Sequence, residues 1–181
     1  MNAIGMIETN SIPAGIEAGD AMLKVAAVEL VAAQAVCAGK YIVIVSGDVA
    51  AVKSAIETAI PVAATYLVDS LTIPNIHEQV IAAISACSEA EKDAALGIIE
   101  TYSLASAVIC ADAAVKAADI DLIEVRLGRG LGGKAFIALT GDVSAANAAV
   151  EAAKSAGEEN GMLANAVVIP SPRKDIFKAI Y

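Results

Sequence analysis

Three cysteines and one histidine are the only thiol and imidazole side chains in this sequence, and their spacing limits the chemistry they could do. The cysteines are Cys37, Cys87 and Cys110, and the histidine is His77. A structural zinc site needs four ligands of these kinds, and a catalytic triad needs a nucleophile beside a histidine. Neither pattern is visible around these residues. The odd number and wide spacing of the cysteines also argue against a disulfide framework.

A glycine-rich run from Gly128 to Lys134 fits two nucleotide-binding patterns. It reads GRGLGGK and so matches both GxGxxG and GxxxxGK. Both patterns need a helix directly after the loop, because the helix N-terminus holds the phosphates. The segment that follows, AFIALT, favours a strand, and Ala135 stands where a P-loop places its Ser or Thr. The run therefore predicts a tight loop rather than a nucleotide site.

The elements that must position Cys37 are two strands joined by a short turn. Alternating apolar residues predict strands at 28–36 and 40–46, around Cys37, Ala38 and Gly39. A strand at 3–9 and a helix at 14–26 precede them. A helix from Val49 to Ala63 follows, with Asp48 as its N-cap and Val52, Ile56 and Ile60 on its inner face. A strand at 66–72 and a short helix from Asn75 to Ile84 complete the order β-α-β-β-α-β-α.

This unit occurs twice. AIGMIET at 3–9 returns as ALGIIET at 95–101, which is 92 residues later. GKYIVIVSGDVAA from Gly39 matches GKAFIALTGDVSA from Gly133 at an offset of 94, and Ile73-Pro74 matches Ile169-Pro170 at 96. Insertions of two residues belong in loops. The repeat predicts an α+β chain with one copy at 1–87, a linker at 88–93 and a second copy at 94–181, neither copy circularly permuted.

The doubled motifs resemble the tandem-domain shell proteins of bacterial microcompartments. The resemblance covers the whole chain and is carried by AIGMIETNSIPAGIEAGDAMLK, by GKYIVIVSGDVAAVKSAIETA and by their second-half counterparts. Among tandem members, the sequence is most similar to the iron–sulfur-binding shell protein of propanediol-utilisation microcompartments. The resemblance implies ferredoxin-like modules in a structural protein that is not an enzyme.

The resemblance also implies a homotrimer that mimics a hexamer, because three chains supply six modules around one axis. Such trimers tile with other shell proteins into a layer that encloses redox enzymes. Lys24 and Lys116 stand where shell proteins place a lysine at the tile edge, although the residues alone fit solvated helix-end lysines equally well. The loops between the second and third strands of each copy would line a central pore, through Val36, Cys37, Ala38, Gly39, Arg129, Gly130, Leu131 and Gly132.

Cys37 has two interpretations. From the residues alone, it is a small apolar side chain or an inert thiol. The resemblance implies that it is a metal ligand, with three copies of Cys37 holding one [4Fe–4S] cluster per trimer for electron transfer across the shell. Leu131 is its counterpart in the second copy, so three thiols rather than six would face the axis. Arg129 would then set an anion preference in the pore, or would simply be solvated.

Two further hypotheses stay open at this point. The first is a shell protein without a cluster, whose central pore conducts small metabolites. The second is a soluble enzyme or nucleotide-binding protein that uses the glycine run. Cys110 is expected in the core, Cys87 is expected to be structural, and the repeated Glu8-Thr9 and Glu100-Thr101 are expected to be architectural.

Composition excludes some partners. The net charge is −9, with 12 basic residues and no basic run, which argues against nucleic acid. Charges interrupt every apolar stretch, and the first residues lack a signal core, so no membrane association is expected. The sequence therefore predicts a cytoplasmic protein in a microcompartment shell.

Overall fold

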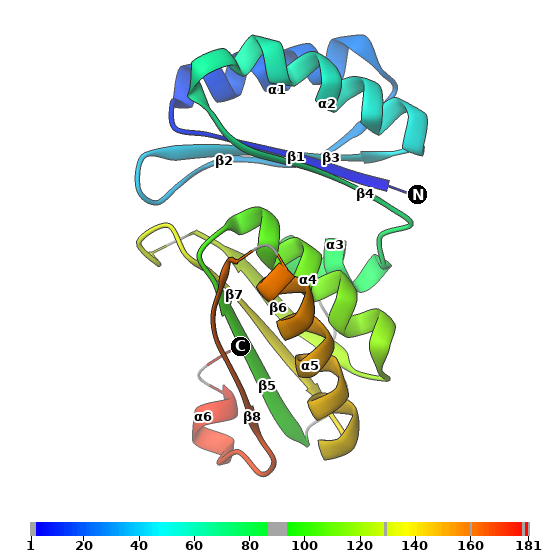
Figure 1. Cartoon of the computed structure of the whole chain (residues 1–181), viewed down its shortest axis with the longest axis vertical. Helices are drawn as coiled ribbons and strands as arrows, with labels where there is room; N and C mark the ends of the chain where they lie inside the picture. Colours follow the sequence, from blue (N-terminus) through cyan, green and yellow to red (C-terminus); the bar gives the residue numbers. More distant parts are fainter. Residues whose placement is uncertain (1–2, 87–93, 129, 160, 179, 181) are drawn as a thin grey trace. The chain divides into compact units, whose positions relative to one another are not determined.

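The structure is a computed structural model that describes residues 3–86, 94–128, 130–159, 161–178 and 180. It divides into two compact units, Met1–Ile76 and His77–Tyr181. Within each unit, a four-stranded antiparallel sheet carries two long helices across one face (Figure 1). The predicted linker at 88–93 and Cys87 lie outside the described residues.

The first unit has the sheet order β2-β3-β1-β4. Its apolar core lies between the sheet and the helices, around Ile7, Met22, Val43 and Ile56. Its elements are β1 (Ala3–Thr9), α1 (Ile12–Val25), β2 (Glu29–Val36), β3 (Lys40–Gly47), α2 (Val49–Ala63), a 3-10 turn at Ala64–Tyr66 and β4 (Leu67–Pro74).

The second unit repeats this arrangement with the order β6-β7-β5-β8. The registers also correspond, since Gly5 lies opposite Val45 and Gly97 lies opposite Leu139. Its elements are α3 (Glu78–Ile84), β5 (Ala95–Thr101), α4 (Leu104–Ala117), β6 (Asp121–Leu127), β7 (Ala135–Gly141), α5 (Val143–Glu159), β8 (Leu163–Ile169) and α6 (Lys174–Lys178).

A glycine in the first strand of each copy lets a helix lie close to the sheet. A Cβ on Gly5 would stand 2.8 Å from side-chain atoms of Val52 and Ile56 in α2, and a Cβ on Gly97 would stand 2.8 Å from Val150 in α5. Real Cβ atoms do not approach other atoms so closely, so any larger residue would push the helix outward. The repeated Ile-Gly and Leu-Gly pairs therefore set the thickness of each unit.

The turn between the first strand and first helix is also built twice. Thr9 Oγ1 donates to the Ser11 carbonyl at 2.9 Å, and Thr101 Oγ1 donates to the Ser103 carbonyl at 2.8 Å. Ser11 and Ser103 then act as N-caps, because each side chain accepts a hydrogen bond from a backbone N–H three residues later. Each threonine thus orients the serine that starts the next helix.

The compact units do not coincide with the sequence copies. The repeat assigns α3 to the end of the first copy, but α3 contacts β6 and α4 and belongs to the second unit. His77 N–H donates to Asp112 Oδ1 at 2.9 Å, and Gln79 Oε1 accepts from Leu122 N–H at 3.0 Å. The last helix of the first copy is therefore a structural part of the second unit.

Four local predictions differ from the structure. The short helix predicted from Asn75 begins only at Glu78, because Asn75 has φ +54° and His77 is the N-cap. Ile60 was expected on the inner face of α2 but is 38% exposed, because the helix turns this position away from Val52 and Ile56. Asp48 occupies the N-cap position of α2, yet its side chain makes no capping hydrogen bond. The first helix begins earlier than predicted, at Ile12, because Ser11 caps it.

Candidate functional site

Cys37 lies in the turn that joins β2 to β3. Val36 and Lys40 are the last register pair of the two strands, so the turn consists of Cys37, Ala38 and Gly39. Val36 is buried, Cys37 is partly exposed, and Ala38 and Gly39 are exposed. Gly39 has φ +77°, where a side chain is strained even though a Cβ would meet no atom within 4 Å. Backbone conformation rather than lack of space therefore favours glycine at position 39. Cys37 lies two residues earlier, at the end of the β2–β3 hairpin.

A buried ion pair fixes the base of this turn. Lys40 Nζ lies 2.6 Å from Glu8 Oε1, and the Glu8 side chain is only 1% exposed. The second copy repeats the pair, since Lys134 Nζ lies 2.7 Å from Glu100 Oε1. The repeated glutamates are thus architectural, as the sequence predicted, and each ties a loop to the first strand of its sheet.

The loop between β6 and β7 is longer and richer in glycine. Gly130 and Gly132 are exposed and have φ of +71° and +62°, while Leu131 is partly exposed. Lys134 N–H donates to the Leu131 carbonyl at 3.1 Å and closes a turn before β7 begins at Ala135. A strand follows the glycines, which confirms that the run is not a phosphate-binding loop before a helix. Arg129 lies outside the described residues.

A metal at Cys37 would need ligands from more than one chain. Within the described part of one chain, no three His, Cys, Asp or Glu side chains are grouped closely enough to hold a metal ion. Cys110 is fully buried in α4, and burial raises the pKa of its thiol from 9.0 to about 11. Cys110 is thus a core residue, as predicted, and Cys37 is the more accessible of the two described thiols.

Lys24 and Lys116 occupy equivalent positions in the last turns of α1 and α4. Each forms an ion pair with an aspartate four residues earlier, Asp20 and Asp112 respectively. The Lys24 side chain is 73% exposed and that of Lys116 is 43% exposed. Both ammonium groups therefore lie at the surface of their units, although they lie on helices and not beside the loops.

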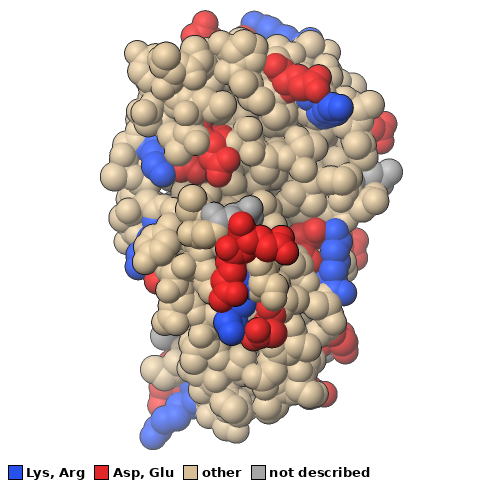
Figure 2. Space-filling model, in the orientation of Figure 1, with Lys and Arg blue, Asp and Glu red and all other residues tan. Residues whose placement is uncertain are grey.

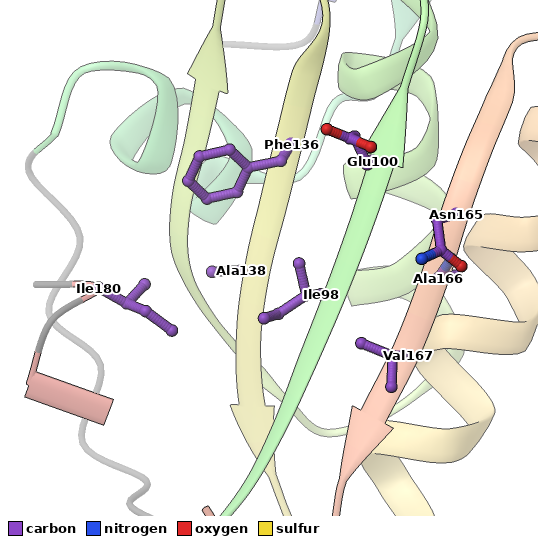
Figure 3. Close-up of a pocket in the computed structure, with 8 residues that line it drawn as sticks. All are labelled: Ile98, Glu100, Phe136, Ala138, Asn165, Ala166, Val167 and Ile180. Carbon is purple, nitrogen blue, oxygen red and sulfur yellow. The ribbon is translucent and has the colours of Figure 1, made fainter. Parts of the chain in front are cut away.

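The second unit also has an apolar pocket of about 330 Å³ on the sheet face opposite α4 and α5. Ile98, Phe136 and Val167 project from three adjacent strands, and Ile180 approaches from beyond α6 (Figure 3). Glu100, already paired with Lys134, and Asn165 add the polar atoms at its edge. This lining suits packing against another apolar surface more than chemistry.

The surface charge is mixed. On the face shown in Figure 2, Lys and Arg side chains lie next to Asp and Glu side chains and form no basic stripe. Among the described residues, no helix combines the length and apolarity required to cross a bilayer.

Sequence reasoning missed two parts of this arrangement. The lysine partners of Glu8 and Glu100 were not foreseen, although the repeated Gly-Lys at 39–40 and 133–134 was a usable signal. An apolar groove of about 210 Å³ between α1 and β2 was also missed, because its members do not follow one helical or strand period.

Two copies of this α+β unit, each with a turn between its second and third strands, define the class of protein. The BMC domain family model matches residues 3–76 and again residues 95–172, so the chain belongs to the BMC domain family, with two tandem domains. This confirms the predicted α+β class, the tandem repeat and the resemblance to microcompartment shell proteins.

Several known proteins match this chain over nearly its whole length. The chain is 44% identical over 176 residues to the bacterial microcompartment shell protein PduT of Citrobacter freundii, covering 97% of this chain and 96% of the relative. It is 31% identical to the carboxysome assembly protein CcmO of Synechococcus elongatus, covering 98% and 68%. A crystal structure of a microcompartment protein from Desulfitobacterium hafniense superposes with a TM-score of 0.94 at 49% identity, covering 98% and 99%. This chain is accordingly a structural microcompartment shell protein.

Proposed function

We propose that three copies of this chain form a ring whose central pore holds one [4Fe–4S] cluster on three Cys37 thiolates, and that the ring conducts electrons through a microcompartment shell. In this proposal the protein is a structural tile and not an enzyme. Closed cyclic symmetry brings one loop from each chain to the axis. The pore would be lined by Cys37, Ala38, Gly39, Arg129, Gly130, Leu131 and Gly132. Val36, which the sequence also placed there, is only 6% exposed and belongs to the core at the base of its turn.

The observation that carries the proposal is the placement of Cys37. Its partly exposed thiol stands in a three-residue turn at the end of a hairpin, and the Lys40–Glu8 pair fixes the hairpin at its base. One chain offers a single thiolate at this place, which is too few for a cluster. Three chains offer three, the number that holds three irons of a cubane cluster and leaves the fourth for another ligand. Such a cluster would supply one-electron transfer.

The chain's own residues would then do three things. The three Cys37 thiolates would bind the cluster. The small Ala38 and Gly39 would leave room for the three turns to approach the axis, and backbone N–H groups of the turns would stabilise the negative charge of the cluster. The ion pairs at Glu8 and Glu100 keep both kinds of loop in position. Lys24 and Lys116 would contact neighbouring tiles in the layer, and the enclosed partners would be redox enzymes.

The test is anaerobic purification of the wild type and a Cys37→Ser variant, followed by iron and sulfide analysis and EPR after reduction. We expect about four irons per three wild-type chains, as one cubane cluster requires, and none in the variant. A Cys110→Ser variant is the matched control, because its thiol is buried away from the loops, and it should keep the iron. Wild-type protein that has no iron and cannot be reconstituted would contradict the cluster and favour a pore for small metabolites.

A further inference from the structure

An apolar groove runs between α1 and β2 of the first unit. Its volume is about 210 Å³, and its lining includes Ile16, Gly19, Leu23, Leu30, Tyr41 and Val43. Ile16 is 53% exposed, Leu23 is 42% exposed and Leu30 is 50% exposed. Large apolar side chains that are exposed side by side mark a surface that packs against something else.

The same surface of the second unit is already covered. The positions equivalent to Leu23 and Leu30 are Val115 and Leu122, which are 8% and 1% exposed. The helix that lies there is α3, which contacts α4 and β6 (Figure 1). Gln79 holds it to Leu122 through the hydrogen bond of 3.0 Å, and Val80 of α3 is fully buried.

The charged residue at this surface shows the same contrast. Asp112 has a 10% exposed side chain and accepts a hydrogen bond from His77 N–H, the residue that caps α3. Its counterpart Asp20 has a 58% exposed side chain. In the second unit, α3 covers the apolar groove and its capping residue donates to Asp112. The first unit has the same groove and the equivalent acceptor, Asp20, but among its described residues no helix corresponds to α3 and covers them.

The repeat identifies the helix that corresponds to α3. At the offset of 96, Arg173 corresponds to His77 and Ile176 corresponds to Val80. The first turns match in detail, since Val80 N–H donates to the His77 carbonyl at 3.0 Å and Ile176 N–H donates to the Arg173 carbonyl at 3.0 Å. This equivalent helix is α6.

The two sides of α6 differ in burial. Phe177 is 7% exposed and packs with Leu96 and Ala138 of its own sheet. Ile176 is 55% exposed, although its counterpart Val80 is completely buried. Phe177 therefore holds α6 on its own sheet, while Ile176 remains available to pack against another molecule.

We infer that the groove between α1 and β2 receives α6 of a second copy of this chain. Ile176 of one chain packs between Leu23 and Leu30 of the next, and Arg173 lies beside the Asp20 carboxylate. Each chain then offers one helix and one groove, a head-to-tail contact that closes into a ring when the rotation permits. The inference rests on the proposed ring and names the contact that joins its chains.

The test replaces Ile176 with the photoreactive p-benzoylphenylalanine in the full chain, because a benzophenone reacts with any C–H group within reach. Isotopically light and heavy chains are mixed before assembly, so a crosslink between chains joins light to heavy peptides. We expect such mixed crosslinks to segment 16–30. The same probe at Ile60, which is exposed on α2 outside the groove, should give none to this segment.

A second variant, Ile176→Asp, should weaken assembly by more than about tenfold, since it places a charge in an apolar contact. Circular dichroism checks that it still folds, and Ile60→Asp is its control. If the wild type is trimeric but Ile176 crosslinks only within its own chain or to other segments, this inference is wrong and the ring stands. If the wild type is monomeric at every concentration, both the inference and the proposed ring are wrong.

Discussion

The Glu8–Lys40 ion pair links the candidate site to the sheet, so Lys40 should matter for stability as well as for the loop. Replacing Lys40 with Met leaves the Glu8 carboxylate buried without its cation, which costs about 3–5 kcal/mol of unfolding free energy. Lys53→Met is the matched control, because the Lys53–Glu57 pair is 3.8 Å apart and both side chains are largely exposed. Its cost should stay below about 1 kcal/mol. Urea unfolding measures both, and equal costs would contradict the structural role of Glu8.

Cys110 should make stability depend on pH at alkaline values. Burial raises the pKa of its thiol to about 11, so the folded protein keeps a proton that the unfolded chain loses from about pH 9. The free energy of unfolding should therefore fall as the pH rises from 9.0 to about 11 and then stop responding to this group. A Cys110→Ala variant shares all other titrations, and denaturant unfolding across this range should show a shallower decline for it. Parallel curves would show that Cys110 does not titrate in this way.

At the scale of the elements, packing of α2 on the first sheet depends on Gly5. A Gly5→Ala variant should lose about 1–3 kcal/mol, because its Cβ would overlap Val52 and Ile56. Gly47→Ala is the control, since a Cβ there would have its nearest neighbours at 3.4–3.6 Å, an ordinary contact. Thermal unfolding compares the two, and a Gly47→Ala variant that loses as much as Gly5→Ala would contradict the close approach of α2.

Much of the secondary structure could be predicted because the same pattern occurs in both copies of the repeat. The strands, the long helices and the turn at Cys37 all follow from alternation, helical spacing and glycine placement. Ile60 was misplaced because its spacing from Ile56 fits the inner face, whereas only tertiary packing decides how wide that face is. The capping role of Asp48 failed for a similar reason, since residue type alone does not orient a side chain.

The partner of α3 could not be predicted from the repeat. The repeat assigns α3 to the first copy, but the hydrogen bonds that hold His77 and Gln79 are made with Asp112 and Leu122, which lie 35 and 43 positions later in the chain. Likewise, the candidate pore residues were found one loop at a time. Whether those loops meet depends on contacts between chains, which no local pattern encodes.

At the scale of the whole molecule, each unit has an exposed apolar surface. The first unit exposes a groove of about 210 Å³, and the second exposes Ile176 and an apolar pocket of about 330 Å³. Head-to-tail assembly would cover such surfaces, which expose large apolar side chains such as Leu23, Leu30 and Ile176.

The measurement that tests the central claim most directly is the native mass of the anaerobically purified wild-type protein, recorded across a dilution series. A ring of three tandem chains predicts a dominant species at three times the 18.2 kDa chain mass, with additional mass from one cluster that disappears in Cys37→Ser. A protein that stays at the mass of one chain, or that assembles only into dimers and tetramers, would contradict the ring and remove the geometry on which the pore depends.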